Sequence, residues 1–299
     1  MRIDPRGLRL FLAVCREGTI SGAARAEHLS QPSVSVAISQ LERTLSTKLF
    51  DRFRRGIQLT PAGEALYRRA EAIENLMDCA YREVQLLEDN IAGPLVIGGT
   101  PGALATLIPR VIDSFSTAFP RFQLQILERS ELELQTLLRS YEIDFAIVSA
   151  GMKENPPDMK ELAVMSDPFS IIVGRKNDHL PNEISLPDLE RARWVLPNAV
   201  GGFRRQVDAL FVSAKAPTPE NVIRSDSLLT TKSIIRNTDY VTILPREVVM
   251  PEVTAGTLRQ IRIREASFQR QVGFLWLKER AMSGLAQTFI DHANMNLEV

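Results

Sequence analysis

The stretch that most constrains the fold is residues 21–60, SGAARAEHLSQPSVSVAISQLERTLSTKLFDRFRRGIQLT. Its small, helix-favouring start predicts a short helix with Ser21 at the N-cap, which His28-Leu29 ends. Ser30 then caps a second, longer helix. Pro32 falls in the first turn of that helix, where backbone N–H groups have no helical partner in any case. The stretch therefore predicts two helices joined by a tight turn.

The second of these helices has two chemically different faces. Apolar residues spaced 4, 3 and 4 apart form a stripe that we expect to be buried: Val34, Ile38, Leu41 and Leu45. A merely solvated opposite face would be rich in Glu and Lys, but here it carries short hydroxyls, amides and one cation. Such side chains allow a helix to lie in the major groove of DNA and contact base edges. The predicted contacts are Gln31, Pro32, Ser33, Ser35, Val36 and Gln40, with Val36 suited to a thymine methyl group.

A basic hairpin is predicted after the second helix, with Gly56 at its turn. Arg52, Arg54 and Arg55 precede the turn and, with Arg43, suit the phosphate backbone of DNA. Two helices followed by such a hairpin predict a winged helix-turn-helix. The alternative is a small helical bundle with a polar surface.

This region resembles the N-terminal signature of LysR-type transcriptional regulators, densely over roughly residues 1–65 and more weakly to the C-terminus. The residues that carry the resemblance are Ala23-Ala24, Leu29 to Ser35, Ile38, Leu41-Glu42, Leu49-Phe50, Arg52 and Leu59 to Gly63. The resemblance implies a homo-oligomeric, sequence-specific DNA-binding regulator. It also implies a C-terminal periplasmic-binding-protein-like α/β domain whose two lobes bind a small-molecule effector between them.

The charge distribution agrees with a DNA partner. Residues 1–60 hold ten Lys/Arg and five Asp/Glu, so a net charge of +5 lies on the first fifth of a chain whose total is zero. The chain has no apolar run long enough for a membrane span and no signal-peptide cleavage pattern, so we expect a cytoplasmic protein. Two cysteines and three scattered histidines give no disulfide framework and no metal site.

Residues 61–90 predict one long helix that begins at Pro61, after a cap at Thr60. Its apolar positions alternate in spacing between 4 and 3, as in a heptad seam. We expect the seam to dimerise the chain, because paired recognition helices read two half-sites; packing against its own chain is the alternative. The predicted dimer contacts are Ala70, Ile73, Met77, Ala80, Val84 and Leu87.

Residues 91–299 predict two α/β lobes after the break at Gly93-Pro94. Strands around 95–98, 122–128 and 144–148 alternate with helices, which predicts a parallel sheet. A second series of strands and helices follows from Phe169. By the resemblance, lobe one takes about 94–163 and 267–299, and lobe two about 164–266. Because these two lobes make up most of the chain, the predicted fold is α/β overall. A winged helix-turn-helix domain at residues 1–60 and a linker helix at residues 61–90 precede them.

Candidate effector contacts lie where strands of the two lobes end, because open α/β sheets bind ligands there and helix N-termini offer N–H groups to an anion. They are Thr100, Gly102, Ser130, Ser149, Asn198 and Phe203, each of which could instead simply cap a loop. Residues 236–239 depart from the Gly-x-Gly-like turn usual in the resembled family, which leaves the effector class open.

We found no phosphate-binding loop with a Walker lysine and no nucleophile elbow, so the chain is not expected to be an enzyme and no cofactor is expected. The rival hypothesis is an α/β enzyme or solute-binding protein with a helical N-terminal domain. The expected partners are double-stranded DNA, a small-molecule effector, further copies of the chain as a homodimer or homotetramer, and RNA polymerase, with no membrane.

Overall fold

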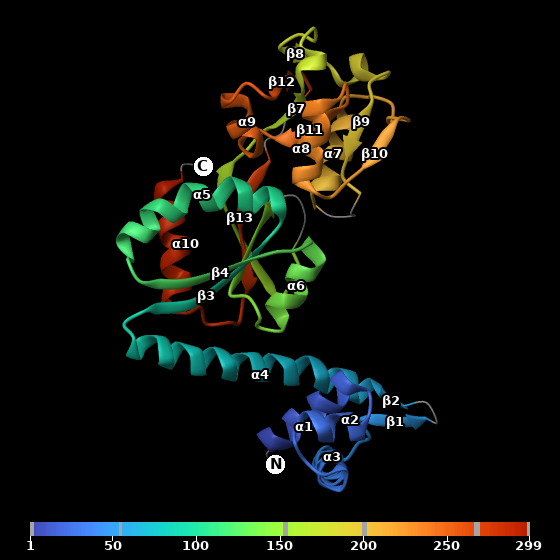
Figure 1. Ribbon diagram of the computed structural model, residues 1–299, viewed down its shortest axis with the longest axis vertical. Coiled ribbons are helices and arrows are strands. Elements are labelled where there is room, and N and C mark those ends of the chain that lie inside the picture. The colour runs from blue at the N-terminus through green and yellow to red at the C-terminus, as the bar shows by residue number, and fades with distance from the viewer. Residues whose placement is uncertain (1–2, 54–55, 152–154, 199–201, 266–269, 298–299) are drawn as a thin grey trace. The chain divides into compact units, whose positions relative to one another are not determined.

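The computed structural model describes residues 3–53, 56–151, 155–198, 202–265 and 270–297 (Figure 1). Contacts divide it into two compact units, Met1–Glu88 with Arg139–Glu142, and Asp89–Leu138 with Ile143–Val299. The described part of the chain contains no helix with the length and apolar character needed to cross a membrane.

The first unit is helical with one antiparallel hairpin. Its elements are α1 (Pro5–Glu17), α2 (Ile20–Ala26), α3 (Gln31–Leu45), β1 (Phe50–Phe53), β2 (Gly56–Leu59) and α4 (Pro61–Glu88). Ser30 caps α3 as predicted, accepting a hydrogen bond from the Ser33 N–H. The cap of α2 was predicted wrongly: Thr19 accepts from the Gly22 N–H, so the helix begins before Ser21.

The core of this unit lies between α1, α2, α3 and the hairpin. Val34, Ile38 and Leu41 are buried and Leu45 packs against them, which confirms the predicted apolar stripe of α3. The ring of Phe11 on α1 lies 5.2 Å from that of Phe50 on β1. This contact attaches the β1–β2 hairpin, which is the wing, to the helical core.

Helix α4 is continuous from Pro61 to Glu88, as predicted. It begins directly against Lys48 and Leu49, the segment between α3 and β1. Thr60 Oγ1 accepts from the Gly63 N–H and donates to the Lys48 carbonyl. A Cβ on Gly63 would lie only 2.1 Å from the Leu49 carbonyl oxygen, so this close approach requires glycine.

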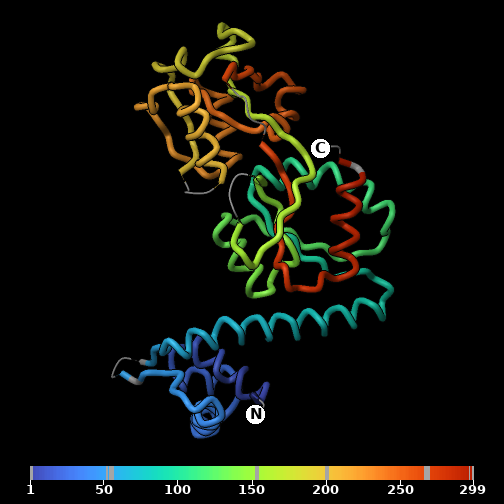
Figure 2. The backbone as a smooth tube through the Cα atoms, turned by 180° about the vertical axis from the view of Figure 1, so that it is seen from behind, coloured from blue at the N-terminus to red at the C-terminus, as the bar shows by residue number. Residues whose placement is uncertain are grey.

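In the second unit, lobe one is built on a five-stranded sheet of order β4-β3-β5-β13-β6 (Figures 1 and 2). Its strands are β3 (Ala92–Gly99), β4 (Phe122–Glu128), β5 (Phe145–Ala150), β6 (Met159–Ser166) and β13 (Gln271–Leu277). Its helices are α5 (Pro101–Ala118), α6 (Glu131–Arg139) and α10 (Gly284–Asn296). The pairs β3–β4 and β3–β5 are parallel, as predicted, whereas β13 runs antiparallel to both neighbours.

Lobe two is built on a six-stranded sheet of order β10-β9-β11-β7-β12-β8. Its strands are β7 (Phe169–Val173), β8 (Glu183–Ile184), β9 (Trp194–Leu196), β10 (Val222–Arg224), β11 (Val241–Pro245) and β12 (Arg259–Ile263). Its helical elements are η1 (Arg175–Asn177), η2 (Leu186–Leu189), α7 (Gly202–Ser213), α8 (Leu228–Asn237), η3 (Glu247–Val249) and α9 (Met250–Thr254). The sequence did not predict β6, β8 or β12.

Two connections join the lobes, and they run side by side. Asp167 and Pro168 link β6 to β7, while the return connection ends at Arg270, immediately before β13 (Figure 2). The Asp167 N–H donates to the Arg270 carbonyl at 2.8 Å, so the backbones are hydrogen-bonded where the chain passes between lobes.

Candidate DNA interface and interlobe site

The polar face of α3 is open to solvent. Gln31, Pro32, Ser33, Gln40 and Arg43 are exposed, and Ser35 is half-buried. Val36 is 63% exposed although it is apolar. Since the opposite side of the helix is packed into the core, all six predicted base-contact residues lie on or beside one accessible surface.

The predicted phosphate contacts are described only in part. The exposed Arg43 donates from Nε to the Ser39 carbonyl at 3.3 Å, which holds the side chain along the helix. Arg52 lies in β1, but the position of its side chain is not described. Arg54 and Arg55 lie outside the described residues.

Glu42 anchors α3 to the wing, a role that sequence analysis missed. Its buried carboxylate accepts from the Leu49 N–H at 3.0 Å and from the Lys48 ammonium at 2.8 Å. Burial raises the pKa of Glu42, but the hydrogen bonds from Lys48 and Leu49 outweigh burial, so the net pKa is below its ordinary value. A charged residue beside Leu41 at the edge of the apolar stripe is the only sequence signal of this role.

The proposed dimer seam is divided by the structure. Ala70 is fully buried in the core of its own unit, so its assignment as a dimer contact was wrong: α4 packs there against α1. The remaining predicted positions are exposed, at 45% for Ile73, 58% for Met77, 56% for Val84 and 64% for Leu87, and Ala80 is exposed too. Leu76 and Tyr81 add to this exposed apolar surface.

On lobe one, Thr100 and Gly102 lie where β3 meets α5. Thr100 is the N-cap residue of α5, but its side chain makes no capping hydrogen bond. Gly102 lies in the first turn of the helix. Ser149, near the end of β5, accepts a hydrogen bond from Arg270 at 3.0 Å, so the structure brings it to the connection between lobes.

The other three predicted effector residues have structural partners. The Ser130 hydroxyl lies 2.5 Å from a carboxylate oxygen of Glu133, in a local turn before α6. The Asn198 N–H donates to Asp226 at 2.8 Å. Phe203 packs into the core of lobe two, with its ring 5.9 Å from that of Phe169. These contacts within the protein account for the positions of the three residues without a bound ligand.

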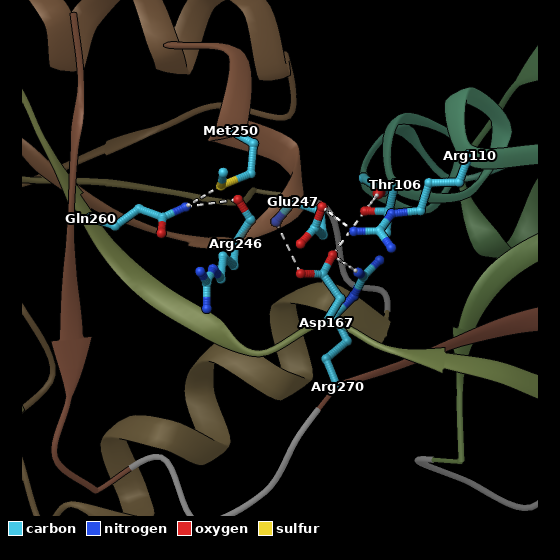
Figure 3. Close-up of polar contacts among 9 residues, drawn as sticks. Thr106, Arg110, Asp167, Arg246, Glu247, Met250, Gln260 and Arg270 are labelled. Carbon is cyan, nitrogen blue, oxygen red and sulfur yellow. Dashed lines mark hydrogen bonds and ion pairs between the residues drawn. The ribbon is translucent and has the colours of Figure 1, made fainter. Parts of the chain in front are cut away.

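A buried ion pair between the two connections was missed by sequence analysis (Figure 3). Asp167 is fully buried and Arg270 is 2% exposed. Nη1 of Arg270 lies 3.1 Å from Oδ2 of Asp167, and Thr106 Oγ1 lies 2.8 Å from the same oxygen. The Glu247 N–H donates to Oδ1 at 3.1 Å, so this carboxylate contacts both lobes.

Two further ion pairs connect the lobes. Arg110 on α5 pairs with Glu247 on η3 at 2.5 Å (Figure 3). Glu131, the first residue of α6, accepts from the Gly202 N–H at 2.6 Å and lies 3.3 Å from Arg205 on α7. Polar contacts therefore hold the lobes together at several elements.

Two hollows of about 250 and 280 Å³ lie elsewhere. The first lies between α3 and the wing, and the second lies in lobe two beside Arg175 and Gly256. In the described ranges, no group of three or more His, Cys, Asp and Glu side chains is arranged to hold a metal ion. Burial raises the pKa of Cys15 to about 12, which keeps it a neutral thiol.

A winged helix-turn-helix with an exposed polar helix face, followed by a long helix and two α/β lobes, defines a DNA-binding regulator with a ligand-binding module. Comparison with known families identifies it further. The model of the bacterial regulatory helix-turn-helix protein, lysR family, matches residues 5–64, and that of the LysR substrate binding domain matches residues 88–297. The chain belongs to the LysR family of transcriptional regulators, and it is a DNA-binding regulator, not an enzyme.

Known relatives agree with this assignment, and a solved structure shares the fold. The HTH-type transcriptional regulator TdcA of Escherichia coli (strain K12) is 25% identical over 292 residues, which cover 96% of this chain and 91% of TdcA. YofA of Bacillus velezensis is 34% identical over 182 residues, covering 61% and 62%. The full-length crystal structure of CbnR in complex with its target DNA shares the fold, with a TM-score of 0.73 at 20% identity and coverage of 98% and 100%.

Proposed function

We propose that the outer face of α3 binds operator DNA, and that an effector bound between the lobes of residues 91–299 controls this activity. The observation that carries the DNA assignment is the contrast between the two sides of α3. One side is buried, whereas the other presents amides, hydroxyls and the exposed methyl groups of Val36. A solvated helix surface has no need of such side chains.

The residue roles follow from chemistry and exposure. Gln31, Ser33, Ser35 and Gln40 would contact base edges, and Pro32 and Val36 would pack against apolar groups in the groove. Arg43 would contact phosphates, together with Arg52, Arg54 and Arg55 of the wing. Residues 1–60 would thus form the DNA-binding domain, in the cytoplasm where bacterial DNA lies.

The exposed apolar residues of α4 support self-association through residues 61–90. A contiguous strip from Ile73 to Leu87 would be shielded from water by the same strip of a second copy. A dimer would present two recognition helices, and a tetramer two such pairs. RNA polymerase would be the partner through which the bound regulator acts on transcription.

Effector control requires a ligand with different affinities for two lobe arrangements, since a ligand that binds both equally shifts nothing. The polar groups that join the two lobes offer such a difference. Thr100, Gly102 and Ser149 would contribute from lobe one. From lobe two, Asn198 would contribute after the end of β9 and Phe203 in the first turn of α7. Ser130 would contribute only if it left Glu133.

The base-contact assignment is tested by Ser35→Ala. We expect the preference for the operator over random DNA to fall by ~1–3 kcal/mol if Ser35 contacts a base. Competition binding with both DNAs at one salt concentration measures this preference. Thr44→Ala, which removes a hydroxyl from the same helix outside the predicted contacts, is the matched control. Unchanged discrimination in Ser35→Ala would remove Ser35 from base recognition.

The phosphate assignment is tested separately by Arg43→Ala. This variant should weaken binding to operator and random DNA alike, and the slope of log K against log salt should fall by about 1. A loss confined to the operator would instead place Arg43 on a base.

A further inference from the structure

One aromatic side chain of the DNA-binding domain lies outside its core. Residues 1–60 contain three aromatic residues, Phe11, Phe50 and Phe53. Phe11 is completely buried and Phe50 is 8% exposed, and their two rings pack together. Phe53, the last residue of β1, is 58% exposed. The core of the described residues thus holds two of these rings but not the third.

The register of the hairpin explains why Phe53 is exposed. Phe50 and Phe53 are three positions apart on one strand, so their side chains leave it on opposite sides. The residue paired with Phe53 across the hairpin is Gly56, which has no side chain that could cover the ring. The hairpin also extends beyond the helices of its own unit (Figure 1). The ring therefore lies on the outer side of the wing, where a partner can reach it.

An exposed phenylalanine on a hairpin is unfavourable unless a partner covers it. Apolar surface gains free energy when it leaves water, and proteins usually protect exposed strands with charged side chains. In the described part of residues 1–60, the other exposed large apolar side chains are those of Ile3 and Val36. Val36 lies on the outer face of α3 and Phe53 on the wing, the two elements to which DNA contacts are assigned above. Two of these three exposed apolar groups therefore coincide with the proposed DNA interface.

The charge around Phe53 indicates which partner covers it. In the sequence Phe53 is flanked by Arg52 and by Arg54-Arg55, in a domain with ten Lys/Arg and five Asp/Glu. The wing of a second copy would carry the same positive charges and would be repelled. Double-stranded DNA is a polyanion, and its minor groove also accepts apolar side chains. DNA can thus pair with the arginines and cover the ring at the same time.

We propose that Phe53 is a specificity-determining residue whose ring enters the minor groove of the operator and acts as an apolar wedge at a base step. The proposal rests on DNA binding by α3 as proposed above. With α3 in the major groove, the wing, which follows α3 after a short connection, meets the neighbouring backbone and minor groove. Phenylalanine is among the side chains that proteins insert between base pairs from that groove.

A ring in this position responds to the stiffness of the DNA. Inserting it partly unstacks two base pairs, and the cost is lowest at flexible pyrimidine–purine steps such as TA and CA/TG. Phenylalanine has no hydrogen-bonding group with which to distinguish base edges directly. Phe53 therefore favours operators with a flexible step beside the segment that α3 contacts, and disfavours a stiff A-tract there.

The test begins with the selection of operator sequences. A pool of random duplex DNA is enriched for binding to the full-length wild type and, separately, to Phe53→Ala and Phe53→Leu. We expect the wild type and Phe53→Leu to enrich a pyrimidine–purine step at a fixed distance from a common central sequence, because leucine is also an apolar wedge. Phe53→Ala should enrich the same central sequence without the flanking step.

Affinity and its salt dependence give an independent measurement. Phe53→Ala should bind the wild-type operator about tenfold more weakly, whereas its binding to random DNA should change by about twofold or less. The slope of log K against log salt should equal that of the wild type, because no phosphate contact is lost. Ile3→Ala removes an exposed apolar side chain of the same domain outside α3 and the wing. This matched control should bind the operator as the wild type does, and thermal unfolding checks that both variants are folded.

Three outcomes would overturn the proposal. They are an equal flanking preference in all variants, an equal loss of affinity for operator and random DNA, and an altered oligomeric state of Phe53→Ala with unchanged operator affinity. The last outcome, measured by sedimentation, would show that a second copy of the chain covers the ring.

The same selection separates this proposal from the proposed function. If the wild type enriches no sequence, sequence-specific DNA binding itself fails. If the wild type enriches an operator and Phe53→Ala shares its full preference and affinity, only the role of Phe53 is wrong and the DNA-binding function stands.

Discussion

On the outer face of α3, the candidate DNA contacts come from residues 31–43 of one helix, whereas the corner around Arg270 is assembled from distant segments. Arg270 bonds to residues 121 and 103 positions away, Ser149 and Asp167, and Asp167 bonds to Thr106, 61 positions away. The first surface is accessible to solvent, and the second is almost completely buried.

The two regions show two ways in which a protein arranges polar groups: exposed on one helix, or buried between distant segments. Polar side chains on an exposed helix face keep their hydration and cost little stability, so they can be exchanged to change specificity. Charges in a buried corner are stable only while each has its partner. We therefore expect substitutions on α3 to change DNA binding with little effect on folding, and substitutions at Arg270 or Asp167 to reduce stability.

The largest effect should follow from leaving Arg270 without its partner. Asp167→Ala should lower the free energy of unfolding by about 3–5 kcal/mol, because a buried charge loses its counter-ion. Arg270→Gln with Asp167→Asn should recover a large part of that loss. Urea denaturation of both variants beside Arg43→Ala, expected within about 0.5 kcal/mol of wild type, measures the contrast. A loss below about 1 kcal/mol for Asp167→Ala would contradict it.

A pair of glycines gives the next largest effect. Gly63→Ala should destabilise the first unit by ~1–3 kcal/mol, because the new methyl group meets the Leu49 backbone oxygen. Gly102→Ala should be neutral, or stabilising by up to about 1 kcal/mol, since alanine favours a helix and its methyl group would meet Arg270 and Val248 only at ordinary van der Waals distances of 3.7 and 3.9 Å. Thermal unfolding of the two variants compares them. Equal losses would show that Gly102 is needed for packing.

The smallest effect concerns acid stability at Glu42. Because the folded-state pKa of Glu42 lies below its unfolded value, its contribution is present above the unfolded pKa and is lost as pH falls through the folded one. Glu42→Gln should cost roughly 1 kcal/mol at neutral pH and lose less stability than wild type on acidification. Denaturation of both proteins at neutral pH and in mild acid measures how much stability each loses on acidification. Parallel curves for the two proteins would mean that Glu42 does not contribute to acid sensitivity.

Regular elements were predictable where a pattern repeats within a few residues. The spacing of Val34, Ile38 and Leu41 predicted the buried side of α3, and the long periodic run after Pro61 predicted α4. The strands β3, β4 and β5 were predicted because apolar runs alternate with helical ones. The lysR-family helix-turn-helix model, which matches residues 5–64, covers all the residues that gave the resemblance.

Elements and contacts that depend on distant neighbours were missed. In β6, Lys160 is exposed beside the buried Met159, and the strand is defined by pairing with β13, more than 100 residues later. Ala70 fits the heptad seam as well as Ile73, but only α1 determines that Ala70 is buried within its own chain. Ser130 and Thr100 occupy equivalent places after strands, and only the local Glu133 distinguishes them.

The sequence alone determined the helix-turn-helix, its polar outer face, the long helix and the alternating α/β order, because these follow from periodicity and capping within short segments. Tertiary structure decided which polar groups meet between the lobes. A lone arginine before a strand and a lone aspartate after another have no distinguishing pattern along the chain. Their significance comes from burial and mutual distance, which arise only when the two connections between the lobes lie side by side.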